Sequence, residues 1–278
     1  MRVQVGDVRI HFEVIGERLV PDGPALRELP TMILLHGGPG FDHNALRPHL
    51  APLADVAQLI FLDHRGQGRS DRSSPDQWNL DTWIDDLAGF CDVLGIEAPI
   101  VFGHSFGGMV ALGLGVRYPE LPSKLVVSNS AAKFRPDRAL DMFERLGGAD
   151  ARAAAQRYFE KPSEDALERF MEVCYPLYGT VPPDPEARAR IVARPAVGIH
   201  YFSREINTFD WFPELDRVAC PTLVLAGELD PITPFACSEE IAAAIPQAQL
   251  EVFPGAGHAP FRDRPSDTLD VIRGFVRS

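Results

Sequence analysis

Hydrophobic and polar residues follow two different patterns along the chain. Near the N-terminus, apolar residues alternate with polar ones over 3–5 and 8–14, and Gly6-Asp7 separates the two runs, which predicts an antiparallel hairpin. Further on, several short runs are continuously apolar, which is typical of parallel strands that helices cover on both faces. These runs are 32–35, 59–62, 100–102, 125–127 and 223–225.

Segments with a helical period separate several of these runs. The clearest covers 82–94, for which we predict Asp81 as the N-cap and Gly95 as the end of the helix. Its apolar positions that share one face are Trp83, Leu87, Phe90 and Leu94. Strands and helices that alternate in this way predict an α/β fold with a doubly wound, mostly parallel sheet.

The alternation breaks between 133 and 211, where helical segments rich in arginine and glutamate are interrupted by prolines. We predict that 133–211 is an inserted helical cap on a core formed by 1–132 and 212–278. The prolines are Pro162, Pro176, Pro182, Pro183, Pro185 and Pro195. The cap is rich in aromatic residues; most of them are expected to pack the cap onto the core, and some to line a pocket between the two parts.

Composition narrows the class of protein. The chain has 278 residues, 45% of them hydrophobic, and a formal net charge of −12, so a nucleic-acid partner is not expected. No apolar run has the length of a membrane span and no cleavable leader is recognisable, which makes a cytoplasmic location the default expectation. We predict no metal and no cofactor, because a His-Glu-x-x-His cluster is absent and the cysteines are not closely paired. Those cysteines are expected to be structural thiols: Cys91, Cys174, Cys220 and Cys237.

Ser105 is the candidate nucleophile. It lies in Gly103-His-Ser-Phe-Gly107, after an apolar run and before a segment compatible with a helix. A strand that turns sharply into a helix holds such a serine in strained geometry, and the flanking glycines let the two elements approach. The pentapeptide is weak evidence alone, so its partners decide the interpretation.

A serine hydroxyl needs a base to accept its proton, and that base needs an acidic group that orients it. Asp230 and His258 each follow an apolar run in a loop, and the order Ser, Asp, His is the one that this type of sheet uses. Asp230 is therefore the candidate acid and His258 the candidate base. Two alternatives are that Asp230 caps the next helix and that Glu228 is the acid.

Acyl transfer also needs two N–H donors for the negative oxygen that develops on the substrate. His36-Gly-Gly-Pro-Gly40 follows an apolar run and offers backbone free of side chains; its alternative role is a simple turn. We expect the N–H groups of Gly38 and Phe106 to form the oxyanion hole. Asp63 and Arg65 are expected to hold a nearby loop rather than take part in chemistry. The same structural role is expected of His64, which lies between them.

Taken together, these motifs resemble the α/β-hydrolase superfamily over nearly the whole chain, and most closely its proline iminopeptidase-like branch. The resemblance implies an α/β-hydrolase fold and hydrolysis of short peptides, small esters or amides. The motifs are His36-Gly-Gly-Pro-Gly40, Asp63-His-Arg-Gly-Gln-Gly-Arg-Ser70, Gly103-His-Ser-Phe-Gly107, Gly227-Glu-Leu-Asp230 and Gly255-Ala-Gly-His258.

The resemblance is weaker in the cap. Proline iminopeptidases hold the substrate's amino group with cap glutamates, one of them in Glu-Asn-His-Tyr-Phe, whereas this chain has Gly198 at the glutamate position; Glu205 and Glu172 are possible substitutes. We therefore predict a serine hydrolase that cleaves a small ester, lactone or amide through an acyl-enzyme. Two alternatives stay open, namely an aminopeptidase of the iminopeptidase type and a ligand-binding receptor without activity. The sequence leaves the substrate-binding residues, the substrate itself and the oligomeric state unknown.

Overall fold

A sheet of eight strands forms the centre of the molecule in the computed structural model, which describes residues 1–182 and 184–278. Its strands follow the order β1-β2-β6-β5-β7-β8-β9-β10, and Pro183, one of the prolines in the predicted cap, lies outside the described residues. The strands of this sheet are β1 (Arg2–Val5), β2 (Val8–Ile15), β5 (Thr31–Leu35), β6 (Gln58–Leu62), β7 (Ile100–His104), β8 (Lys124–Ser128), β9 (Thr222–Gly227) and β10 (Ala248–Phe253).

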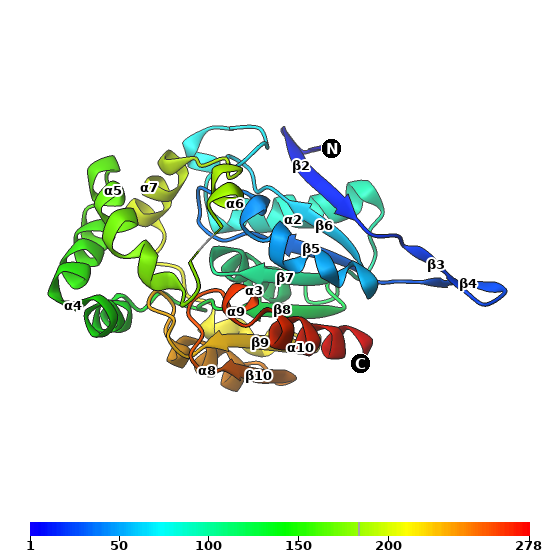
Figure 1. The fold of residues 1–278 in the computed structure, drawn as a ribbon. Helices are drawn as coiled ribbons and strands as arrows, with labels where there is room; N and C mark the ends of the chain where they lie inside the picture. The colour runs from blue at the N-terminus through cyan, green and yellow to red at the C-terminus, as the bar shows by residue number, and fades with distance from the viewer. Residues whose placement is uncertain (183) are drawn as a thin grey trace.

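Strand directions divide the sheet into a short antiparallel part and a long parallel part. β1 pairs antiparallel with β2, with Val5 opposite Val8, so the hairpin predicted around Gly6-Asp7 is confirmed. β2 is antiparallel to β6, and all pairs from β6 to β10 are parallel. A separate hairpin of β3 (Leu19–Asp22) and β4 (Ala25–Glu28) was not predicted; it extends away from the sheet (Figure 1).

Helices cover both faces of the sheet, so the predicted doubly wound α/β arrangement is confirmed. Side chains alternate between faces along β5: Ile33 and Leu35 pack with α2 and α3, whereas Met32 and Leu34 pack with α1 and α10. The core helices are α1 (Arg47–Leu50), α2 (Leu80–Leu94), α3 (Phe106–Arg117), α8 (Phe235–Ala244), α9 (Pro260–Asp263) and α10 (Pro265–Arg277). In the described residues, no helix combines the length and the apolar character needed to cross a bilayer.

The boundaries of α2 correct one prediction. The helix begins at Leu80, and the side chain of Asn79 accepts a hydrogen bond of 2.9 Å from the N–H of Thr82. Asn79 is therefore the N-cap, and the prediction that Asp81 caps the helix is wrong. Asparagine and aspartate cap helices equally well, so the pattern alone did not separate the two positions. The helix ends as predicted at Gly95, whose φ of 62° is left-handed.

The chain between β8 and β9 forms a separate group of helices beyond one end of the sheet (Figure 1). These helices are α4 (Pro136–Glu160), which is interrupted at Gly148, α5 (Glu164–Val173), α6 (Pro185–Ala189) and α7 (Pro195–Arg204). The N–H of Trp211 donates a hydrogen bond of 2.9 Å to the carbonyl of Ala132, so the two ends of this segment meet. The segment thus leaves the core and returns to it at one point.

Candidate active site

The candidate nucleophile lies on a tight turn between β7 and α3. Ser105 has φ 55° and ψ −119°, a strained conformation for a residue with a side chain. A Cβ atom at Gly103 would lie 2.3 Å from the carbonyl oxygen of Gly107, and one at Gly107 would lie 2.3 Å from that of Leu35. Only glycine fits at both flanking positions, which is the packing that the motif predicted.

Neighbouring backbone holds this turn in place. The N–H of Ser105 donates to the carbonyl of Ser128 at 2.9 Å, and the hydroxyl of Ser130 donates to the carbonyl of Ser105 at 2.7 Å. The hydroxyl of Ser105 makes no hydrogen bond with any residue that the structure describes, and Ser105 lines a cavity. Its side chain is thus held by its backbone and remains available to a ligand.

Asp230 and His258 form a buried pair. Nδ1 of His258 donates to Oδ2 of Asp230 at 2.8 Å, since a carboxylate can only accept. Asp230 also accepts hydrogen bonds from the side chains of Asn129 (2.9 Å) and Thr233 (2.8 Å), and from the N–H groups of Ile232 (2.9 Å) and Thr233 (3.1 Å). Burial raises the pKa of Asp230, but the attraction of His258 and these hydrogen bonds outweigh burial and lower it.

The other interpretations of Asp230 do not fit the structure. α8 begins at Phe235 after Pro234, so Asp230 is not the N-cap of that helix. Glu228 is exposed, and its side chain accepts from the N–H of Gly255 at 2.9 Å rather than from His258. Among the two candidate acids, Asp230 is the one that contacts the histidine.

The loop of His258 is tied to the helical segment above it. The N–H of His258 donates to the carbonyl of Tyr178 at 2.7 Å, and the rings of these two residues lie 5.0 Å apart. Asp263 accepts from the N–H groups of Gly257 (2.8 Å) and Thr180 (3.1 Å), which lie on the two sides of this contact. With Nδ1 bound to Asp230, Nε2 is the nitrogen of His258 that is left for a ligand or for Ser105, which lines the same cavity.

The candidate oxyanion hole lies beside Ser105. A Cβ atom at Gly37 would lie 3.2 Å from Cβ of Ser105, which brings the turn after β5 against the nucleophile. Within the described residues, the N–H groups of Gly38 and Phe106 donate to no acceptor. Gly38 has φ 130°, and a Cβ atom there would lie 2.8 Å from the nitrogen of Gly40. Both predicted donors are therefore free, and the turn requires glycine.

A buried histidine fixes this turn. The N–H of His64 donates to Nε2 of His36 at 3.2 Å, so the proton of His36 is on Nδ1, which donates to the carbonyl of Gly37 at 2.8 Å. Burial lowers the pKa of His36, which keeps the ring neutral. Gln67 supports the same turn by accepting from the N–H of Gly40 at 2.6 Å.

The predicted roles of Asp63 and Arg65 match their contacts. Asp63 is buried and accepts from the N–H groups of His43 (2.9 Å) and Arg69 (2.8 Å), so it holds the loops next to the oxyanion turn. Arg65 donates to Asp86 at 2.6 Å and to Asp7 at 2.8 Å. Neither residue lines the cavity.

Among the described residues, two side-chain groups have the spacing of metal ligands, but none of their members lines the cavity. They are His11, Glu13 and His43, and Asp42, His43 and Asp63. Their carboxylates already have partners: Asp63 contacts Nδ1 of His43 at 2.6 Å, Arg47 contacts Glu13 at 3.0 Å, and Arg69 contacts Asp42 at 2.6 Å. The catalytic candidates involve none of these residues.

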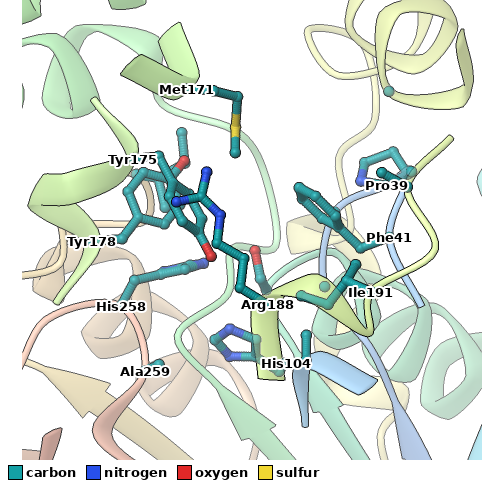
Figure 2. Close-up of a pocket in the computed structure, with 18 of the residues that line it drawn as sticks. Pro39, Phe41, His104, Met171, Tyr175, Tyr178, Arg188, Ile191, His258 and Ala259 are labelled. Carbon is teal, nitrogen blue, oxygen red and sulfur yellow. The ribbon is translucent and has the colours of Figure 1, made fainter. Parts of the chain in front are cut away.

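A cavity of about 310 Å³ lies between the sheet and the helical segment, and it contains Ser105 and His258 (Figure 2). Its helical side carries aromatic residues, including Tyr158, Tyr175 and Phe202. The volume is at the lower end of the range for small-molecule sites. The bound molecule is therefore expected to be small and partly apolar.

The two glutamates that were candidates for binding an amino group do not line the cavity. Glu205 accepts from the N–H of Leu80 at the start of α2 (2.9 Å), and Glu172 pairs with Arg169 on the surface (2.8 Å). At Gly198, which does line the cavity, a Cβ atom would lie 2.9 Å from the carbonyl oxygen of Pro39. Neither Glu205 nor Glu172 is therefore placed to bind an amino group in the cavity, as the glutamate expected at the position of Gly198 would.

Sequence analysis missed several residues that support the site, because distant parts of the chain supply them. Asn129 follows β8 and contacts Asp230, 101 positions away. Asp263 joins the His258 loop to the segment after Tyr178. An asparagine directly after an apolar run was a usable signal for Asn129, since its positive φ of 45° is one that asparagine tolerates. No local signal identified Asp263.

Comparisons with known proteins agree with this fold. The family model described as alpha/beta hydrolase fold matches residues 30–265. A protein named as carbamate hydrolase RutD, from Caulobacter sp. (strain K31), is 29% identical over 247 residues, which cover 81% of this chain and 87% of that protein. A proline iminopeptidase of Clostridium botulinum (strain Hall) is 27% identical over 286 residues, which cover 97% of this chain and 95% of that protein. The crystal structure of a proline iminopeptidase from Mycobacterium smegmatis has a TM-score of 0.80 and 27% identity, with 100% of this chain and 97% of that one covered.

Proposed function

The chain belongs to the alpha/beta hydrolase fold family, and we propose that it is a serine hydrolase that cleaves a small ester, lactone or amide. The observation that carries this proposal is the buried 2.8 Å pair of Asp230 and His258 on the cavity that also contains the strained Ser105. A nucleophile, a base oriented by an acid, and two free N–H donors are together the requirements of acyl transfer.

In the proposed reaction, Nε2 of His258 takes the proton of the Ser105 hydroxyl while Oγ attacks the substrate's carbonyl carbon. Asp230 keeps the proton of His258 on Nδ1 and stabilises the imidazolium that forms. The N–H groups of Gly38 and Phe106 donate to the oxyanion. His258 then gives its proton to the leaving group, and the acyl group stays on Ser105. A water, deprotonated by His258, attacks this ester, and collapse returns the proton to Ser105 and releases the acid.

We propose that 133–211 acts as the cap over this site, with the core in 1–132 and 212–278. The bond between Trp211 and Ala132 joins the ends of the segment, and the bond between His258 and Tyr178 ties it to the catalytic loop. The aromatic lining contributed by this segment would exclude water and bind an apolar part of the substrate.

Aminopeptidase activity is the second candidate, because proline iminopeptidases are among the similar proteins. A free amino group needs a carboxylate partner. Among the described residues that line the cavity, Asp184 is the one with a carboxylate. It already accepts a hydrogen bond from the N–H of Glu186 at 2.9 Å. The cavity therefore favours substrates without a free amine.

A substrate panel tests the proposal. We would measure turnover of short-chain p-nitrophenyl esters, a lactone, a carbamate, and proline and alanine p-nitroanilides with free and blocked N-termini, each against Ser105→Ala. The proposal predicts turnover of an ester or lactone that the variant loses, without preference for free amines. Preference for free-amine anilides would favour the aminopeptidase, and no turnover by the intact protein would favour a receptor.

A further inference from the structure

The charged side chains in the cavity do not follow the charge of the whole chain. The chain has a formal net charge of −12, yet the charged side chains of the described residues that line the cavity are Arg188, Arg262 and one carboxylate, Asp184. That carboxylate is engaged by the N–H of Glu186. Asp184 also pairs with Arg190 at 3.9 Å, so the lining arginines outnumber a carboxylate that already has a partner, which favours a negatively charged ligand.

Arg188 is the cation of this pair with no anionic partner. Its guanidinium lies 5.4 Å from the centre of the Tyr175 ring, and no carboxylate of the described residues pairs with it. Figure 2 shows the side chain of Arg188, which comes from α6, crossing in front of the Tyr175 ring. Arg262 differs, because its Nε donates to Asp263 at 3.2 Å. Arg188 therefore has its donors available in the cavity that His258 also lines.

Neutral donors add to this bias. Three tyrosines line the cavity, and in the described part of the chain none of their hydroxyls is hydrogen-bonded. They are Tyr158, Tyr175 and Tyr178. A tyrosine hydroxyl can donate or accept, but a guanidinium only donates, so a ligand that satisfies these groups together must supply acceptor oxygens. A carboxylate offers two such oxygens in the plane that matches a guanidinium.

We propose that Arg188 binds a carboxylate of the substrate, so that the preferred substrates are esters, lactones or amides that carry a carboxylate apart from the bond to be cleaved. This inference rests on the proposed function. The tyrosine ring holds the guanidinium over the cavity by a cation–π contact, and the aromatic cap binds the rest of the molecule.

Two matched pairs of esters test it. In the first pair the carboxylate is on the acyl side: mono-4-nitrophenyl adipate and its neutral methyl ester. In the second it is on the leaving group: 4-acetoxybenzoate and its neutral methyl ester. For each pair we would measure the ratio of kcat/KM for the charged ester to that for the neutral ester. The intact protein is expected to favour the charged member of at least one pair.

Arg188→Gln removes the charge while keeping an amide donor, and it should lower that ratio at least tenfold. Arg169→Gln is the matched control, because Arg169 is an arginine of the same helical segment that pairs with Glu172 (2.8 Å) on the surface and does not line the cavity. The control should keep the ratio of the intact protein. Sodium chloride at high concentration should also reduce the ratio, since ions screen an exposed charge.

Calorimetry with free adipate and free benzoate separates this inference from the proposed function. Ser105→Ala should bind at least one of them, and Ser105→Ala with Arg188→Gln should bind it at least tenfold more weakly. If esters are cleaved but the ratio is the same in Arg188→Gln, the inference fails and the hydrolase stands. If nothing is cleaved but binding depends on Arg188, the hydrolase fails and the anion site stands. Absence of both effects overturns the inference.

Discussion

Replacement of Asp230 by asparagine probes the proposed machinery at its least exposed member. Every group within hydrogen-bond distance of the carboxylate donates to it. Oδ1 accepts from the N–H groups of Ile232 and Thr233, and Oδ2 accepts from His258, Asn129 and the hydroxyl of Thr233. An asparagine has one oxygen and one NH₂ group to face these five donors.

The orientation of the new amide follows from which donors can adjust. The backbone N–H groups at Oδ1 cannot turn, so the amide oxygen should face them and the NH₂ group should face His258. The Thr233 hydroxyl can rotate to accept, and His258 can adapt only by moving its proton from Nδ1 to Nε2. A protonated Nε2 cannot take the proton of Ser105.

The magnitude follows from this exchange of tautomers. A wrong tautomer in a serine hydrolase lowers kcat by about 10⁴, which corresponds to about 5 kcal/mol of transition-state stabilisation. The buried donors left without an acceptor should cost about 1–3 kcal/mol of stability, less than the ~5–15 kcal/mol of a typical domain. Asp230→Asn should therefore fold and be nearly inactive.

The assay is kcat on the best ester of the panel, with the urea midpoint as the test of folding. Glu228→Gln is the matched control, because Glu228 is an exposed carboxylate in the same loop that does not contact His258. A folded Asp230→Asn that keeps more than a tenth of kcat, or a Glu228→Gln that loses as much activity as Asp230→Asn, would refute the reasoning.

Three further predictions concern the oxyanion turn, acid stability and the thiols. Gly38→Ala should lower kcat by about 10²–10³ while the protein stays folded, because its Cβ would lie 2.8 Å from the nitrogen of Gly40 and move the donor; unchanged kcat would exclude this role. Burial lowers the pKa of His36, His64 and His104, so below pH about 6.5 the unfolded chain takes up protons that the folded chain does not, and stability falls by up to about 1.4 kcal/mol per pH unit for each imidazole; equal urea midpoints at pH 6.5 and pH 5 would contradict this. Burial raises the pKa of the four thiols to about 11 or about 12, so the native protein should not react with a disulfide reagent at pH 8, and the unfolded chain should react at every thiol. These thiols are Cys91, Cys174, Cys220 and Cys237.

The motifs predicted the α/β-hydrolase fold, and the family match confirms it. The prediction was possible because the motifs contain tight turns that few residue types can form. A Cβ atom at Gly103 or at Gly107 would lie 2.3 Å from a carbonyl oxygen, so the fold accepts only glycine at these two positions. The loops that follow β5, β7, β9 and β10 meet at one edge of the sheet, because these strands are parallel. Local patterns therefore predicted which loops would meet.

Features that depend on contacts between distant segments were not predicted. Asp263 bonds to Gly257 and Thr180, and nothing near Asp263 in the sequence indicates either partner. The absence of a cap glutamate was visible at Gly198, but only the structure reveals that Glu205 is used at the start of α2. The sequence did not distinguish Arg188 from the other arginines of its charged segment, because only the structure reveals that it lines the cavity. The catalytic roles of Ser105, Asp230 and His258 stay predictions that experiments must decide.

The most direct test of the central claim is the reaction of the protein with a fluorophosphonate, followed by intact mass measurement and peptide mapping. The account predicts one added phosphonyl group, on the peptide that contains Ser105, and none in Ser105→Ala or in protein unfolded before the reaction. An intact, folded protein that stays unlabelled, or one labelled on another residue, would contradict the claim that Ser105 is an activated nucleophile.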